Sequence, residues 1–356
     1  MESTVMTPVA EDVLRVLGQV IDPELGRDVV SLGMIRDVQV EDGVAQFTLC
    51  LTTPACPIRD QLEYTARKAV ADLPGIHDVR VQVKSQVPTG YGLPRSAQRS
   101  ILGVRQIIAV ASGKGGVGKS TVAVHLALAL AETGAQVGLL DADFYGPNVP
   151  QMLGSVGWPV TRNNQLVPIE SRGLRVMSFA YLIKPGSPVI WRGPLLMSAI
   201  QQMLFDVDWG ELDYLVVDLP PGTGDVPLSL VQLVKLAGVV VVTTPQSVAV
   251  SDVLRSIEMF QATGASVLGV VENMSYLQCP DCGRRLEIFG RGGGEWLAGQ
   301  FEIPLLGQIP LDPAICESGD LGQPVSDLNS PVAQAFRQVA SKVAAQVSIH
   351  QFAGIS

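Results

Sequence analysis

The sequence is poor in charged residues, in histidine and in long apolar runs. Of its 356 residues only 17% are charged and three are histidine, whereas 47% are hydrophobic. The apolar stretches, such as residues 122–131, are much shorter than the roughly 20 residues that span a bilayer. The N-terminus also lacks a basic segment followed by the apolar core of a secretory signal. We therefore expect a globular, cytoplasmic protein with no membrane partner.

Positive charge is scarce as well. The 25 Lys and Arg residues are outnumbered by 34 Asp and Glu residues, which gives a formal net charge of −9, and no block of five basic residues occurs. Surfaces that bind nucleic acids need clustered Lys and Arg to displace counterions from the phosphates. The composition therefore argues against a nucleic-acid partner.

Cysteine is rare and unevenly placed. Five cysteines in a chain of this length do not form a disulfide framework, and in a reducing compartment a close pair is typical of metal or redox chemistry. Cys279 and Cys282 are such a pair. Cys50 and Cys316 have no motif around them, and we predict that both are packing residues.

The length and the hydrophobic pattern indicate two domains, since chains beyond about 250 to 300 residues usually divide. In residues 1–84 the pattern predicts a helix over 9–20, a hairpin with strands near 38–40 and 46–51, a helix over 57–73 and a strand over 78–84. This region is predicted to be a small α+β domain. Residues 85–105 mix Pro, Gly, Ser and Arg without either period, which predicts a linker.

From residue 106 the pattern changes to short β-branched runs separated by helical segments. The runs cover residues 107–111, 136–141, 214–218, 238–243 and 266–271. Runs of this kind, without polar alternation, predict parallel strands buried on both faces by helices. We therefore predict an α/β domain over residues 106–356, which ends in an amphipathic helix over 331–347.

A phosphate-binding loop follows the first of these strands. Its sequence fits G-x-x-x-x-G-K-[ST] and opens a predicted helix over 121–132. Its residues are Gly113, Lys114, Gly115, Gly116, Val117, Gly118, Lys119, Ser120 and Thr121. Glycines let backbone N–H groups turn toward phosphate oxygens, Lys119 can reach the β and γ phosphates, and Ser120 can coordinate magnesium. The sequence thus predicts binding of a nucleoside triphosphate with Mg²⁺.

Lys114 is not needed by a loop that cradles phosphates within one subunit, and on local grounds it could be a solvated surface lysine. With it, however, the loop resembles the deviant Walker A ATPases. In that family the early lysine reaches the nucleotide bound by a partner subunit. The resemblance implies that ATP binds at a homodimer interface and that Lys114 acts there beside Lys119.

Three aspartates end strands at the edge of the sheet where α/β proteins place their ligands. Asp141 ends the strand over 136–141 and Asp143 comes two residues later, while Asp218 ends the strand over 214–218. The family resemblance implies that Asp143 orients the attacking water. Asp141 is expected to support Asp143 or the magnesium shell. Asp218 reads as a Walker B acid that holds a magnesium-bound water. A lone acid at such a place is otherwise a cap or turn residue.

Asn273, just beyond the strand over 266–271, matches the position of the family's base-contacting asparagine. An amide offers both a donor and an acceptor to an adenine edge. A turn-forming Asn is the local alternative.

The Cys279–Cys282 knuckle has spacing that suits two thiolates on one metal centre. Two ligands are half a site, and the three histidines are remote in sequence. A two-fold axis would bring two pairs together, so the predicted centre lies between subunits. An iron–sulfur cluster, a structural zinc and a redox dithiol remain as alternatives.

Five segments share one family pattern: the phosphate-binding loop, residues 141–150 (DADFYGPNVP), 191–194 (WRGP), 218–225 (DLPPGTGD) and the cysteine pair. Together they resemble the Mrp/ApbC branch of P-loop ATPases, which are iron–sulfur cluster carriers related to the nitrogenase iron protein and MinD. His125 departs from the pattern, since relatives often carry Asn there.

Residues 1–84 resemble a domain of iron–sulfur assembly factors, through residues 22–24 (DPE) and 53–57 (TPACP). Within this segment Cys56 is either a reactive cysteine beside a helix start or a small buried residue.

The resemblance implies an ATPase that carries a [4Fe-4S] cluster between Cys279 and Cys282 of two subunits and delivers it to apo iron–sulfur proteins, working with cluster-assembly factors. The rival interpretation is a MinD/ParA-like positioning or partition ATPase in which the cysteine pair holds a structural zinc. That class needs a basic patch or an amphipathic membrane helix. The last predicted helix has only Arg337 and Lys342 as basic residues before His350.

Overall fold

The computed structural model describes residues 8–87, 98–182, 193–325 and 330–353. The chain divides into two compact units, one of residues 1–88 together with 351–356 and the other of residues 89–350. Each unit has its own sheet and its own hydrophobic core.

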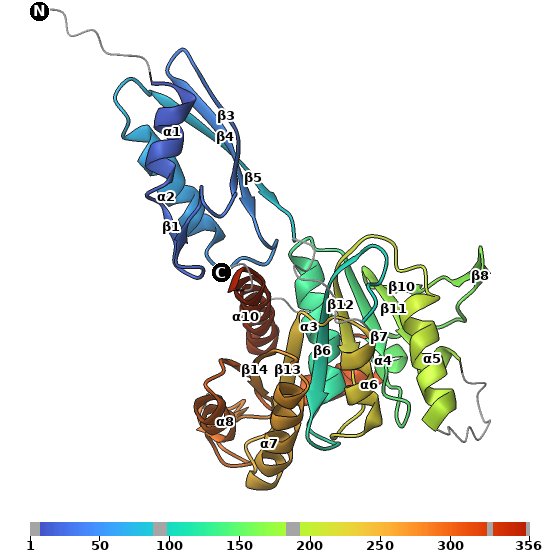
Figure 1. The fold of residues 1–356 in the computed structure, drawn as a ribbon. Helices are drawn as coiled ribbons and strands as arrows, with labels where there is room; N and C mark the ends of the chain where they lie inside the picture. The colour runs from blue at the N-terminus through green and yellow to red at the C-terminus, as the bar shows by residue number, and fades with distance from the viewer. Residues whose placement is uncertain (1–7, 88–97, 183–192, 326–329, 354–356) are drawn as a thin grey trace, which may run out of the picture. The chain divides into compact units, whose positions relative to one another are not determined.

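The first unit is a small α+β fold, as predicted (Figure 1). Its elements are α1 (Ala10–Leu17), β1 (Ile21–Asp22), β2 (Arg27–Asp28), β3 (Ile35–Glu41), β4 (Val44–Leu51), α2 (Arg59–Ala71) and β5 (Asp78–Ser85). β3 and β4 form the predicted hairpin, and β5 pairs with β4 in parallel. The hairpin turn places Asp42 and Gly43 at positive φ, which the Asp-Gly pair tolerates well. The two helices bury Val13, Leu17 and Leu62 among the apolar side chains of the strands.

The predicted linker over residues 85–105 is too long at both ends. Ser85 is the last residue of β5, and the backbone N–H of Gln86 donates to the Leu51 carbonyl. At the other end the N–H of Arg99 donates to the Leu233 carbonyl, and Ile101 is buried in the core of the second unit. Gln86, Arg99 and Ile101 each make a contact of their own but lie outside helices and strands of the sheet, so no hydrophobic period marks them. Residues 88–97 lie outside the described part of the chain.

The second unit contains an eight-stranded sheet in the order β10-β11-β7-β12-β6-β13-β14-β17. The strands are β6 (Val104–Ser112), β7 (Val137–Asp141), β10 (Ile169–Ser171), β11 (Leu174–Ser178), β12 (Leu212–Asp218), β13 (Gly238–Thr243), β14 (Val267–Glu272) and β17 (Leu305–Gln308). All neighbours are parallel except β10, which pairs antiparallel with β11 at one edge. The five predicted strands form the centre, and the pattern missed the three short strands near the edges.

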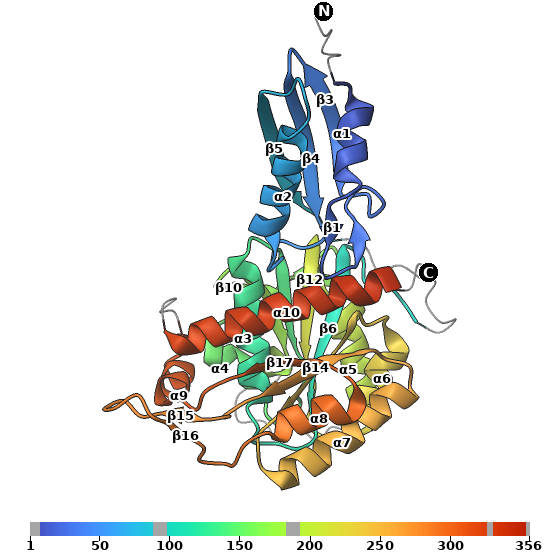
Figure 2. The same ribbon diagram turned by 90° about the vertical axis from the view of Figure 1, so that its left-hand side faces the viewer.

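Helices cover both faces of this sheet, which confirms the predicted α/β fold (Figures 1 and 2). One face carries α3 (Lys119–Glu132) and α10 (Pro331–Ala353), and the His125 ring of α3 stacks on the Phe336 ring of α10 with centroids 4.4 Å apart. The other face carries α5 (Gly193–Phe205), α6 (Asp225–Leu233), α7 (Ser247–Ala262) and α8 (Gly293–Phe301), whose buried side chains share one core with Ile107 and Ala109 of β6.

Shorter elements lie around the sheet. They are α4 (Val149–Leu153), η1 (Phe179–Tyr181), α9 (Pro313–Asp320) and the strand pairs β8 (Thr161–Arg162) with β9 (Gln165–Leu166) and β15 (Leu277–Gln278) with β16 (Arg285–Leu286). None of the helices in the described ranges has both the length and the apolar character that crossing a bilayer requires.

Candidate functional site

The phosphate-binding loop lies between the end of β6 at Ser112 and the start of α3 at Lys119. Gly116 and Gly118 have φ angles of 82° and 80°, a left-handed conformation that glycine adopts without strain. Gly113 has a packing role, since a Cβ there would lie 2.3 Å from the Asp252 carbonyl carbon of α7. The sequence therefore folds into a tight turn whose next N–H groups belong to the first turn of a helix.

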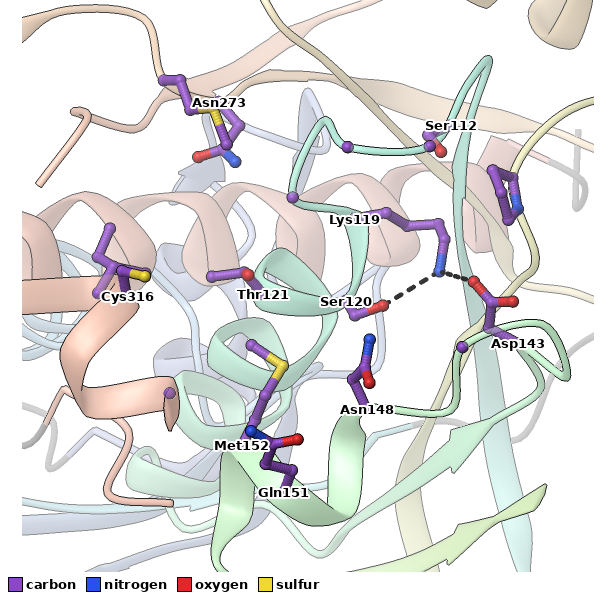
Figure 3. Close-up of a pocket in the computed structure, with 18 of the residues that line it drawn as sticks. Ser112, Lys119, Ser120, Thr121, Asp143, Asn148, Gln151, Met152, Asn273 and Cys316 are labelled. Carbon is purple, nitrogen blue, oxygen red and sulfur yellow. Dashed lines mark hydrogen bonds and ion pairs between the residues drawn. The ribbon is translucent and has the colours of Figure 1, made fainter. Parts of the chain in front are cut away.

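A cavity of about 690 Å³ opens over this loop (Figure 3). It lies where β6, β7 and β14 end, because parallel strands place their carboxyl ends at one edge of the sheet. The predicted residues that line it are Lys114, Gly115, Gly116, Gly118, Lys119, Ser120, Thr121, Asp143 and Asn273. Four other predicted residues do not line the cavity: Gly113, Val117, Asp141 and Asp218. The Cys279–Cys282 pair does not line it either.

Lys119 is the centre of the charge arrangement at this site. Its side chain is 6% exposed, and its Nζ lies 2.6 Å from Asp218 Oδ1, 3.5 Å from Asp143 Oδ2 and 3.3 Å from Ser120 Oγ. Figure 3 shows the ammonium group between Ser120 and Asp143. Two carboxylates thus hold the cation in the position where it would meet the phosphates of a nucleotide.

Asp218 fits the role of an acid that holds magnesium through water. Its carboxylate is fully buried, and Oδ2 has no hydrogen-bond partner within the described part of the chain. Burial raises the pKa of Asp218, and the nearby Lys119 ammonium opposes that rise. A buried oxygen without a partner is costly unless a water or an ion satisfies it. The carboxylate and the Ser120 hydroxyl are the oxygen ligands that magnesium takes together with its waters.

Asp141 organises the loop that carries Asp143. Its carboxylate accepts hydrogen bonds from Ser178 Oγ at 2.8 Å, from the Asp143 N–H at 3.2 Å and from the Val149 N–H at 3.3 Å. Burial raises the pKa of Asp141 to about 8, and the negative charge of Asp218 adds to the rise. Of the two roles predicted for Asp141, support of its neighbours agrees with these contacts.

We expect Asp141→Asn to flatten the pH dependence of stability in the nucleotide-free protein. Because the native pKa lies above the ordinary value of about 4, the native state holds this proton more tightly than the unfolded chain. The resulting stabilisation is present below pH 4 and is lost as the pH rises toward 8. Between these limits the wild type should lose up to about 1.4 kcal/mol of unfolding free energy per pH unit relative to the variant.

Urea unfolding at pH 5, 6, 7 and 8, followed by tryptophan fluorescence, measures this difference. All four tryptophans occur after residue 150, so the signal reports the second unit alone. Asp206→Asn, at an exposed position directly after α5, is the control. Stability curves for wild type and Asp141→Asn that run parallel over this range would contradict the assignment.

Asn273 follows β14 and reaches the phosphate-binding loop. Its Nδ2 donates to the Val117 carbonyl at 2.9 Å, and a Cβ at Gly118 would lie 2.2 Å from the same nitrogen. The residue is 4% exposed and lines the cavity. The amide therefore supports the loop, and its contact with a base stays a prediction.

The far wall of the cavity comes from residues that the sequence analysis missed. They belong to α4, to the segment after β17 and to α9, and include Asn148, Gln151, Met152, Pro310, Leu311 and Cys316. The prediction that Cys316 is a packing residue is wrong, since its side chain is exposed and lines the cavity. Apart from Asn148, which belongs to the 141–150 motif, no local motif marks this wall. Its residues after β17 reach the cavity because β17 ends at the same edge of the sheet as β14. Cys50 is half-buried in β4.

The cysteine pair lies on a short hairpin formed by β15 and β16, which we call the cysteine hairpin (residues 277–286; Figure 2). The N–H of Cys279 donates to the Arg284 carbonyl, and the N–H of Gly283 donates to the Cys279 carbonyl. Hydrogen bonds from the N–H groups of Cys282 and Asp281 and from the Cys282 side chain lower the pKa of Cys279. Both thiols are free.

The residues that the structure describes do not complete a metal site around this pair. Among the described residues, no group of three or more His, Cys, Asp or Glu side chains is placed to hold a metal. Cys282 is exposed and Cys279 half-buried, so both are open to ligands from outside the chain. A metal centre on this pair would therefore need further ligands.

Cys56, in the first unit, has a different environment. It is half-buried against the core of that unit, and burial raises the pKa of the Cys56 thiol to about 11, although the N–H of Ile58 lowers it. The Glu24 and Asp22 carboxylates add to the rise. Of the two predicted roles, the structure favours packing, because burial outweighs the effect of the nearby helix start.

The parallel sheet, the glycine-rich loop that opens α3 and the buried Lys119–Asp218 pair define a P-loop NTPase. The family model described as NUBPL iron-transfer P-loop NTPase matches residues 103–344, and the model described as iron–sulfur cluster assembly protein matches residues 10–83. The chain belongs to the NUBPL iron-transfer P-loop NTPase family. Two motif residues that carry the resemblance, Trp191 and Arg192, lie outside the described residues.

Curated relatives match nearly the whole chain. A protein of Synechocystis named iron-sulfur cluster carrier protein is 50% identical over 95% of this chain and 97% of its own length. A Deinococcus radiodurans protein of the same name is 51% identical over 94% and 95%. A chloroplastic Fe-S cluster assembly factor of Arabidopsis thaliana is 42% identical over 95% of this chain and 65% of its own length.

Solved structures match the second unit. A nucleotide-binding protein from Archaeoglobus fulgidus, in complex with ADP, is 41% identical, with a TM-score of 0.58 over 65% of this chain and 92% of that chain. The cell division ATPase MinD of Pyrococcus furiosus is 25% identical, with a TM-score of 0.50 over 67% and 98%. The P-loop fold is thus common to proteins with different names.

Proposed function

We propose that this protein is an ATP-dependent iron–sulfur cluster carrier that acts in the cytoplasm. As a homodimer it would bind a [4Fe-4S] cluster between Cys279 and Cys282 of its two subunits and transfer the cluster to apo-proteins. The observation that carries the proposal is the open pair of thiols on the cysteine hairpin, in a chain whose near relatives are named iron-sulfur cluster carrier proteins. Cluster-assembly factors would supply the cargo.

The chemistry of the hairpin supports a cluster as cargo. Soft thiolates are the ligands that iron–sulfur clusters prefer, and a lowered pKa increases the thiolate fraction of Cys279. A two-fold axis converts two thiolates per chain into the four that a cubane cluster takes. The hairpin is exposed, so a cargo held there remains within reach of an acceptor protein.

The residues around Lys119 support a role for ATP. A bound nucleotide would draw the Lys119 ammonium from Asp218 and Asp143 to its phosphates, while Ser120 and Asp218 hold the magnesium ion and its waters. Magnesium supplies charge neutralisation at the transferring phosphoryl group. Asp143, released from Lys119, would then orient the attacking water.

The proposal is tested by measuring iron, zinc and acid-labile sulfide per dimer after anaerobic reconstitution, together with the visible spectrum. We expect about four irons and four sulfides per dimer in the wild type, and none in a Cys279→Ala, Cys282→Ala double variant. Cys50→Ala is the matched control, because Cys50 lies on β4 in the first unit and should leave the stoichiometry unchanged.

Zinc near one per dimer without sulfide, unchanged by the reconstitution, would overturn the proposal. That result would favour the rival positioning or partition ATPase with a structural zinc. Co-sedimentation with anionic liposomes and with DNA then tests the rival function. For the carrier proposed here we expect both sedimentation results to be negative, since the chain carries a net charge of −9.

A further inference from the structure

Three polar side chains join the cysteine hairpin to the wall of the nucleotide cavity. We propose that Glu272, Gln308 and Arg285, here called the carboxylate relay, are positioning residues that couple nucleotide binding to cluster binding. The inference rests on the proposed function, since it assumes that the hairpin carries the cluster. Neither the P-loop motif nor the Cys-x-x-Cys motif includes any of the three residues.

Glu272 is the buried end of the relay. It is the last residue of β14, its side chain has an exposed fraction of 0%, and its carboxylate makes three hydrogen bonds. Oε1 accepts from Ser275 Oγ at 2.6 Å and from Gln308 Nε2 at 3.1 Å, and Oε2 accepts from the Gly294 N–H at 2.6 Å. A buried carboxylate with this many donors holds them in fixed positions, because each bond to a charged group is strong and its loss would leave the charge unsatisfied.

The glycines before α8 allow this arrangement. A Cβ on Gly294 would lie 2.8 Å from the Glu272 Cβ, and a Cβ on Gly293 would lie 2.8 Å from the Pro245 carbonyl oxygen. Only glycine lets the start of α8 come this close to the ends of β13 and β14. The helix N-terminus then faces the carboxylate, which is the favourable direction for its dipole.

Gln308 and Arg285 extend the contact to the cysteine hairpin. Gln308 ends β17 directly opposite Glu272, and its Oε1 accepts from Arg285 Nη2 at 3.2 Å. Arg285 lies in β16, and its guanidinium stacks 3.8 Å above the Tyr276 ring. Because the amide of Gln308 donates to a carboxylate and accepts from a guanidinium, its orientation is determined at both ends.

The same segments reach the nucleotide cavity. Asn273, next to Glu272, holds the Val117 carbonyl of the phosphate-binding loop. The N–H of Leu311 donates to the Tyr276 carbonyl at 2.7 Å, and both Leu311 and its neighbour Pro310 line the cavity. A shift of the loop or of this wall when nucleotide binds therefore moves the stem of the cysteine hairpin. The Gln308–Arg285 contact carries the shift beyond the stem to β16.

Coupling of this kind is reciprocal, so it can be measured as an affinity ratio. The dissociation constant of a non-hydrolysable ATP analogue with Mg²⁺ is measured for the apo and the cluster-loaded protein. We expect the two values to differ at least about 5-fold in the wild type. In Arg285→Met and Gln308→Met the ratio should fall below about 2-fold, with cluster stoichiometry and apo affinity unchanged.

Two further variants separate positioning from general damage. Arg284→Met removes the neighbouring exposed arginine, whose side chain makes no hydrogen bond or ion pair with the described residues, and it should keep the wild-type ratio. Arg285→Lys retains the charge over Tyr276 and should restore part of the coupling. Gln308→Met should fold normally, because Glu272 keeps its bonds to Ser275 and Gly294.

A second readout needs no cluster. Iodoacetamide labelling of the apo-protein, resolved by peptide mass spectrometry, gives separate rates for Cys279 and Cys282 with and without the analogue. We expect nucleotide to change these rates in the wild type and in Arg284→Met, and not in Arg285→Met. Cys316 lines the cavity, so its protection reports that nucleotide has bound in every sample.

A wild-type affinity ratio near one, or a ratio that survives in both relay variants, would overturn the inference. If the wild type binds no cluster, the proposed function fails. The labelling experiment still decides whether the relay transmits nucleotide binding to the hairpin, so the two failures are distinguishable.

Discussion

Lys119→Ala is expected to lower ATP turnover by at least about 100-fold, because the site loses the buried ammonium group that lies beside Asp218 and Ser120, where the β and γ phosphates would bind. Nucleotide affinity should fall with it. Cluster stoichiometry should stay at the wild-type value, since the cysteine hairpin does not contact Lys119 in the structure. Steady-state phosphate release, calorimetric binding of ATP, and iron and sulfide analysis measure the three quantities.

The same substitution also removes the counter-charge of two buried carboxylates. Breaking a buried ion pair by deleting one partner costs about 3 to 5 kcal/mol, so Lys119→Ala should be less stable than the wild type. The double variant Lys119→Ala, Asp218→Asn relieves this cost and serves as the stable control. It should recover most of the unfolding free energy without recovering turnover.

Loss of the cluster from this stable double variant would contradict the assignment of cluster and nucleotide to separate sites. Full turnover in Lys119→Ala would contradict the assignment of the phosphate site itself. Neither result would conflict with the carboxylate relay, which concerns the affinity of each site when the other is occupied.

A heterodimer of one Lys114→Ala subunit and one Lys119→Ala subunit is expected to recover about half of the wild-type ATPase activity. Each homodimer should be inactive. If Lys114 acts on the nucleotide of its partner, the Lys114→Ala subunit retains its own Lys119 and receives the intact Lys114 of the other chain. One of the two sites is then complete, and the other lacks both lysines.

Activity of this heterodimer distinguishes contact of Lys114 with the nucleotide of the partner from contact with the nucleotide of its own chain. Lys114 is half-exposed and lines the cavity of its own chain, so contact within the subunit is also sterically possible. Two different affinity tags and two purification steps isolate the heterodimer, and a doubly tagged wild-type dimer is the reference. An inactive heterodimer would show that both lysines serve the same chain.

Much of the nucleotide site could be predicted because its parts are continuous in the sequence. Gly116, Gly118 and Lys119 lie in one short loop, and the conformations of glycine and the first turn of a helix follow from local chemistry. The central strands were also predictable, since burial on both faces demands apolar runs. The short strands β10, β11 and β17 were missed because three to five residues carry too little of a pattern.

Burial decided properties that local sequence could not. Cys56 stands beside a helix start, which predicts a lowered pKa, yet partial burial raises it instead. Cys316 has no motif and was predicted to pack inside, yet it faces the cavity. Desolvation depends on which distant segments cover a side chain, and the residues next to it in sequence do not specify that.

The sequence by itself determined the class of the protein, the phosphate-binding loop and the paired thiols, because each depends on residues at fixed short spacing. The tertiary structure alone decided which polar side chains meet. Lys119 and Asp218 are 99 positions apart, and Glu272 and Gln308 are 36 apart. These pairs form because the register of the parallel strands places the end of β12 beside the loop that follows β6, and the ends of β14 and β17 beside each other. Register follows from the packing of the whole sheet.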